Sequence, residues 1–183
     1  MKHIHRYQNN LIDRIERTDW PEFNRNGFLF ELHNLANSMH NQRSISGYLS
    51  SFLIYQQLCE EIIKLLIECS NLFIQCTIFP NEFKPKKLDG KTFGQLIIEL
   101  ENGVCNDETH LLIKKCKELN ALRIRMVHKV TLKTSVKDIE KQAKSAKKMY
   151  DQAYKFFSEI REVYNISFGK YNADEMRELI RNF

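Results

Sequence analysis

The chain has 183 residues, enough to bury the core of one domain, and a formal net charge of +5 that permits nucleic-acid binding without requiring it. Its six glycines and three prolines are few for this length, so long helices are expected rather than many short strands. The longest apolar stretch, residues 61–76, contains Lys64, Glu68 and Gln75, and the N-terminus lacks the apolar segment of a signal peptide. We therefore expect no membrane segment.

The cysteines predict a reduced, cytoplasmic protein. Their number is odd, no CxxC pair occurs and most lie in apolar stretches, which is typical of buried free thiols. They are Cys59, Cys69, Cys76, Cys105 and Cys116. His33 and His40 are seven residues apart but no further ligand types join them, so we expect no metal and no other cofactor. The phosphate-binding, dinucleotide-binding and α/β-hydrolase motifs are absent.

Residues 5–43 are predicted to form two N-terminal helices. The first covers residues 5–17, and the Asp19-Trp20-Pro21-Glu22 segment resembles the start of the second, with an aspartate N-cap and a proline in the first turn. The second helix carries apolar residues at steps of four, three and four, which predicts one buried face made of Phe28, Leu32, Leu35 and Met39.

The most apolar predicted helix covers about residues 48–77. Apolar side chains surround most of its circumference, which is typical of a central helix in a bundle or in an interface. Its polar exceptions form one island, made of Gln56, Gln57, Glu60, Glu61 and Lys64.

Two further helices follow a lysine-bearing loop at residues 80–91. The Thr92-Phe93-Gly94-Gln95 segment resembles a capping box and starts a short helix through about Glu101. Asn106-Asp107 then caps a helix that is predicted to end near Val130.

The last long helix is predicted to start at Thr134-Ser135 and to end at Gly169, and residues 172–182 form a terminal helix. Steps of three and four residues give it an apolar seam of Val136, Ile139, Ala143, Ala146, Tyr150, Ala153, Phe157, Ile160 and Tyr164. Together these helices predict an all-α fold over residues 1–183, an up-and-down bundle of four to five main helices with short accessory helices. Residues 5–43 and 172–182 are expected to pack on a core at about residues 45–165.

Chemistry-bearing residues gather near the end of the penultimate long helix. The Arg123-Ile124-Arg125-Met126-Val127-His128 segment fits the pattern R-x4-H. In this place in an all-α bundle the pattern resembles the HEPN superfamily, and the resemblance covers roughly residues 45–165. The family frequently has Asn directly after the arginine, whereas this chain has Ile124 followed by a second arginine.

The resemblance implies a metal-independent endoribonuclease, often a toxin or phage-defence effector, that acts as a homodimer. A cognate antitoxin or a larger defence complex is a further partner that it suggests. Histidine exchanges protons near neutral pH, so His128 can take a proton from the 2′-hydroxyl or give one to the leaving 5′-oxygen. Arg123 can donate hydrogen bonds to the phosphate oxygens. The implied product carries a 2′,3′-cyclic phosphate. Other family members are non-catalytic RNA-binding or scaffold proteins, which is our alternative.

Helix geometry constrains this site. Positions five apart differ by about 140° around a helix, whereas Arg125 and His128 differ by only about 60°. A second copy across a two-fold axis could complete the site, or the helix could unwind near His128. We predict a composite site of Arg123 and His128, with Arg125 supporting phosphate binding. The alternative is a solvated basic helix end, stabilised by the helix dipole.

Two neighbouring groups could support the site. Gln56, Glu60 and Glu61 could orient the arginine or the histidine, or could form a structural ion pair with Lys64 or another helix. A basic stripe along the last helix extends the positive surface and could follow an RNA backbone, or could be an ordinary solvated face. The stripe consists of Lys137, Lys141, Lys144 and Lys148, with Lys129 and Lys133 before it.

Overall fold

The computed structural model describes the whole chain except residues 1, 23–26, 105, 130–134 and 182–183, and the side chains of residues 2–5 and 127–129 also lie outside the description. The described residues form seven helices and no strand, which confirms the all-α prediction. The helices are α1 (Lys2–Glu16), α2 (Phe28–Asn41), α3 (Ile45–Thr77), α4 (Phe93–Gly103), α5 (Asp107–Lys129), α6 (Val136–Phe168) and α7 (Ala173–Arg181).

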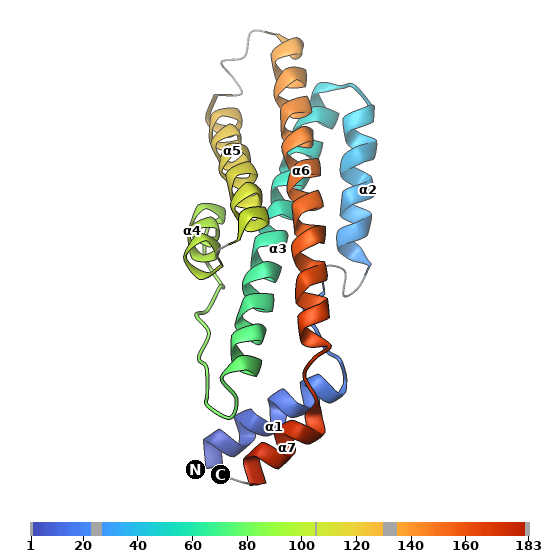
Figure 1. Cartoon of the computed structure of the whole chain (residues 1–183). Helices are drawn as coiled ribbons and strands as arrows, with labels where there is room; N and C mark the ends of the chain where they lie inside the picture. The colour runs from blue at the N-terminus through green and yellow to red at the C-terminus, as the bar shows by residue number, and fades with distance from the viewer. Residues whose placement is uncertain (1, 23–26, 105, 130–134, 182–183) are drawn as a thin grey trace.

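Four helices form the body of the bundle. Figure 1 shows α2, α3, α5 and α6 lying lengthwise. Taken in that order, the four helices alternate in direction. The short α4 packs against α3 and α5, while α1 and α7 lie side by side across one end. An ion pair between Arg177 and Glu16 joins these two end helices. The up-and-down arrangement places the end of α5 and the start of α6 at the far end of the bundle from α1 and α7.

The core is built around α3 and α6 and also takes in buried residues of α1, α4, α5 and α7. Tyr55 of α3 stacks on Tyr150 of α6, with their ring centroids 4.9 Å apart, and neither ring is exposed. The predicted apolar seam of α6 is confirmed from Ile139 to Ile160, while Val136 is exposed and Tyr164 is only partly buried. Alanines in the seam have small side chains, so the backbones of α3 and α6 can approach closely.

The predicted helix starts after residue 90 are confirmed by their caps. The Thr92 side chain accepts a hydrogen bond from the backbone N–H of Gln95, and the Gln95 side chain accepts one from the backbone N–H of Thr92, so the capping box is complete. The Oδ1 atom of Asn106 accepts from the N–H of Thr109 at 2.7 Å. Ser135 caps α6 in the same way, through the N–H of Asp138. Each cap satisfies backbone donors that have no partner inside the helix.

The predicted start of the second helix is wrong. Residues 19–22 are not helical, and α2 begins only at Phe28, after Gly27 with a φ of 74°. The reason is tertiary: Trp20 stacks on Phe168 with ring centroids 5.0 Å apart, and Pro21 is buried. Packing of this segment on the end of α6 outweighs its local resemblance to a helix start.

The predicted buried face of α2 is wrong at two of its four positions. Phe28 and Leu35 are exposed, whereas Leu32 and Met39 are partly buried, and Ala36 is the fully buried residue of this helix. The inward face carries His33, Asn37 and His40, because the tyrosine hydroxyls of α3 and α6 need hydrogen-bond partners there.

The prediction of buried free thiols is confirmed at four of the five cysteines. Cys59, Cys69, Cys76 and Cys116 are free and buried, and Cys105 lies outside the described residues. No helix in the described part of the chain is both long enough and apolar enough to span a lipid bilayer.

Candidate functional site

The R-x4-H segment lies in the last two turns of α5. The backbone remains helical through Lys129, so α5 does not unwind at His128. Positions 123 and 128 are therefore about 140° apart around one helix. The side chains of His128 and Lys129, and the whole of Lys133, lie outside the described residues.

Arg123 belongs to the inward side of α5. It lies about 20° around the helix from Cys116, which has no exposed surface. The Arg123 side chain is partly buried, and its near neighbours on this side, Leu119 and Met126, are buried. Among the described residues no hydrogen bond or ion pair engages its guanidinium group. The solvated basic helix end that was our alternative therefore stays a prediction beside the composite site.

Arg125 differs from Arg123 in its surroundings. Its side chain is exposed, as is that of Ile124. Arg125 is therefore free to contact a ligand from solvent, and the structure does not place it beside Arg123.

The polar island of α3 is bonded within its own helix. The Nζ atom of Lys64 lies 3.1 Å from a carboxylate oxygen of Glu60 and 2.7 Å from one of Glu61. The buried Gln56 side chain donates to Glu60 at 3.4 Å. Burial disfavours the charge on Lys64, but its bonds to Glu61 and Glu60 outweigh burial and raise its pKa. The structural ion pair that we considered is present, and no hydrogen bond or ion pair between described residues joins the island to Arg123.

The basic stripe lies on the outward face of α6. Lys141 is about 160° around the helix from Ala143 of the buried seam, and Lys137 and Lys144 are exposed too. Lys144 is paired with Glu140 at 2.6 Å. Their hydrogen bond raises the pKa of Lys144 and lowers that of Glu140.

A polar network that the sequence did not reveal connects α2, α3 and α6. Tyr55 donates from its hydroxyl to Asn37 Oδ1 at 2.9 Å, and Asn37 Nδ2 donates to His33 Nε2 at 2.9 Å. The Nε2 atom of His33 is thus an acceptor, so the proton is on Nδ1, which donates to the Tyr150 hydroxyl at 2.7 Å. Burial lowers the pKa of His33 and raises the pKa values of Tyr55 and Tyr150, so all three are neutral.

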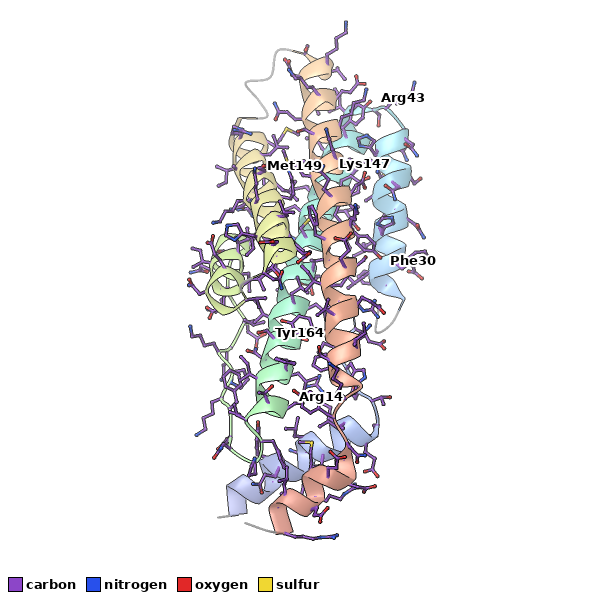
Figure 2. The ribbon with its side chains drawn as sticks, in the orientation of Figure 1. Arg14, Phe30, Arg43, Lys147, Met149 and Tyr164 are labelled. Carbon is purple, nitrogen blue, oxygen red and sulfur yellow. The ribbon has the colours of Figure 1, made fainter. Side chains whose placement is uncertain are left out.

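His40 lies three residues after Asn37, on the same face of α2. Its ring packs edge-on against Tyr48 at 5.5 Å, and its Nδ1 atom is buried without a hydrogen-bond partner among the described residues. Burial and the neighbouring Lys147 and Lys144 lower the pKa of His40. His40 lines a groove between α2 and α6, together with Lys144, Lys147, Lys148, Asp151, Gln152 and Lys155. Figure 2 shows Lys147 on the α2 side of α6 and Met149 on the α5 side.

The signal for these residues was present in the sequence. His33, Asn37 and His40 recur at steps of four and three, the spacing of one helix face. In the part of the chain that the structure describes, no group of three or more histidine, cysteine and acidic residues could hold a metal ion.

Comparisons with models of protein families, with curated proteins and with solved structures found no match. The HEPN resemblance therefore stays a prediction, which rests on the R-x4-H spacing and on its place in the chain.

Proposed function

We propose that the protein is a metal-independent endoribonuclease of HEPN type. It acts as a toxin or phage-defence effector in the cytoplasm and cuts RNA at a cleft between two copies of the chain. A cognate antitoxin or a larger defence complex controls it.

Arg123 is the observation that carries the proposal. The Arg123 side chain is partly buried on the core side of α5, and no described carboxylate pairs with it, so its guanidinium group is available to an anion. Arginine binds phosphate oxygens through two parallel N–H groups, so an RNA phosphate would supply the missing partner. The histidine that the chemistry needs follows five residues later.

The reaction needs one proton taken and one proton given. A basic group removes the proton from the 2′-hydroxyl, whose oxygen attacks the adjacent phosphorus, and the 5′-oxygen leaves with a proton. His128 moves these protons, while Arg123 stabilises the negative charge that develops on the phosphorane oxygens. The products are a 2′,3′-cyclic phosphate and a 5′-hydroxyl end.

The angle between the two positions supports a dimer. Because α5 stays helical through Lys129, Arg123 and His128 of one copy lie about 140° apart and do not share a face. A two-fold axis near the ends of two α5 helices brings Arg123 of one copy to His128 of the other.

A complementation experiment tests both the chemistry and the dimer. Purified wild-type protein, with EDTA present, is expected to release RNA fragments with cyclic phosphate ends. His128→Ala and Arg123→Met are each expected to reduce the rate by about 10²-fold or more. Mixing the two variants is expected to restore roughly a quarter of the wild-type rate, because half of the dimers then contain one intact composite site.

Lys170→Met is the matched control, since this lysine is exposed at the opposite end of the bundle and is expected to leave cleavage unchanged. Equal cleavage by wild-type protein and His128→Ala would contradict the nuclease. Two inactive variants that stay inactive when mixed would contradict the composite site.

One observation favours a second candidate, a non-catalytic RNA-binding or scaffold protein. Glu60 and Glu61 are engaged by Lys64, and Ile124 stands where the family frequently has Asn. Among the described residues, no carboxylate or amide side chain is thus bonded to Arg123. RNA that binds without being cut by any form of the protein would support this candidate.

A further inference from the structure

The groove between α2 and α6 is lined mainly by basic residues. It has a volume of about 440 Å³ and is lined by four lysines, one aspartate, one glutamine and His40. Arg43 at the end of α2 adds a further cation, whose field reaches Glu140 and Lys144. None of the residues that line the groove is apolar.

The lysines of the groove can release their present partners. Lys147 is paired with Asp151 at 2.8 Å and Lys155 with Glu159 at 3.8 Å, each one turn further along α6. Exposed pairs of this kind contribute little to stability, so a ligand with several negative charges can replace them. Lys148 has no ion pair with any described residue.

His40 distinguishes the groove from an ordinary lysine-rich surface. Its ring forms part of the lining, yet its Nδ1 atom is buried without a partner. Tyr48 holds the ring in place from the side of α3. A fixed imidazole among flexible lysine side chains gives the groove one rigid polar group.

We propose that this groove binds the phosphate backbone of single-stranded RNA, which would be the substrate of the nuclease proposed above. Lysines one and two turns apart can each meet a phosphate, and their methylene stems can contact riboses and bases. A lipid surface is a poorer fit, because a groove without apolar residues offers nothing to insert among acyl chains.

The groove also predicts the path of the RNA. It faces α2, whereas α5 and its R-x4-H segment lie on the other side of α6. Lys137 lies at the same angle around α6 as Lys155 of the groove, and Lys141 lies about 40° further around, both toward the start of the helix. A strand anchored in the groove would follow these lysines along α6 toward its start, which lies beside the end of α5.

The test measures binding separately from cleavage. His128→Ala protein is titrated into a fluorescein-labelled oligouridylate of roughly 16 nucleotides, and anisotropy is recorded at several salt concentrations. Lys148→Glu with Lys155→Glu is the groove variant, and Lys87→Glu with Lys170→Glu is the control with the same change in charge. All four lysines are exposed. Circular dichroism melting confirms that each protein is folded.

The groove variant is expected to bind at least about tenfold more weakly and to lose about 1.4 from the slope of log affinity against log salt, which corresponds to two phosphates. The control pair is expected to keep both values. Equal weakening in both pairs, or none in either, would overturn the proposal. So would groove-dependent binding of phosphatidylserine vesicles or polyglutamate that matches binding of the RNA.

The two proposals fail separately. Groove-dependent RNA binding without cleavage by the wild-type protein would contradict the proposed nuclease activity but support the proposed RNA-binding groove. His128-dependent cleavage with unchanged binding by the groove variant would overturn the groove alone.

Discussion

The end of α5 and the inward face of α2 both place polar side chains on the side of a helix that faces the core. On α2, His33 and Asn37 are joined to Tyr55 and Tyr150 by hydrogen bonds of 2.7 to 2.9 Å. On α5, the partly buried Arg123 has no such partner among the described residues. A satisfied polar group stabilises the fold, whereas an unsatisfied one is a candidate for binding a ligand.

Replacing Arg123 gives the largest expected effect and tests this distinction directly. Arg123→Met is expected to reduce RNA cleavage by about 10²-fold or more, through loss of phosphate contacts. Its melting temperature is expected to change little, because Arg123 forms no hydrogen bond or ion pair with a described residue. Cleavage rates and thermal melting of the purified variant measure both effects.

Arg125→Met is the matched control, since this arginine is exposed two residues away. It is expected to reduce cleavage less than Arg123→Met does. If the Arg123→Met protein is destabilised but cleaves RNA at the wild-type rate, Arg123 stabilises the fold and does not bind the RNA phosphate. That result would contradict the contrast between α5 and α2.

Removing the central amide of the α2 network gives the next largest effect, on stability. Asn37→Ala leaves the Tyr55 hydroxyl and His33 Nε2 without partners and is expected to cost about 1–3 kcal/mol. Urea denaturation measures this cost. Asn34→Ala, an exposed asparagine on the same helix, is expected to change stability little. Equal effects of the two substitutions would show that the network does not hold α2 in place.

The histidines of α2 predict a loss of stability in mild acid. The pKa values of His33 and His40 are lowered, first of all by burial, so the folded protein binds fewer protons than the unfolded chain just below pH 6.5. Their contribution is fully present above about pH 6.5 and is lost as the pH falls through that range toward the folded pKa values.

Melting at pH 7.5 and 5.5 checks this dependence on pH. His40→Gln is expected to melt at temperatures that differ less between the two conditions than the wild type does. The charged and titratable groups around His40 are Lys144, Lys147, Asp151 and Glu140 of α6, with Tyr48 and Tyr55 of α3. His110→Gln changes an exposed histidine of α5 and is expected to keep the wild-type difference. If His110→Gln narrows the difference between the two pH values and His40→Gln does not, His40 is not the source of the acid sensitivity.

The polar island of α3 gives the smallest expected effect. Lys64→Met removes the partner of Glu60 and Glu61, and because these groups are partly exposed the cost is expected to stay below about 1 kcal/mol. Cleavage is expected to remain at the wild-type rate if the island is structural. A large loss of cleavage without loss of stability would instead show that its carboxylates orient the site.

The candidate site was only partly readable from the sequence. The R-x4-H spacing places Arg123 and His128 on one helix, and helix geometry alone separates them by about 140°. That Arg123 is partly buried and Glu60 is bonded to Lys64 depends on neighbouring side chains, which the spacing does not specify. The groove at His40 needs α2 and α6 side by side, so no single segment could predict it.

The sequence by itself determined the helices whose signals are local. The caps at Thr92, Asn106 and Ser135 and the seam of α6 each act within a few residues, and each is present in the structure. Only the tertiary structure decided where α2 begins and which face it buries. Trp20 packs on Phe168 and His33 bonds to Tyr150, and such contacts between distant parts of the chain outweigh local helix signals because they bury more surface and satisfy buried donors.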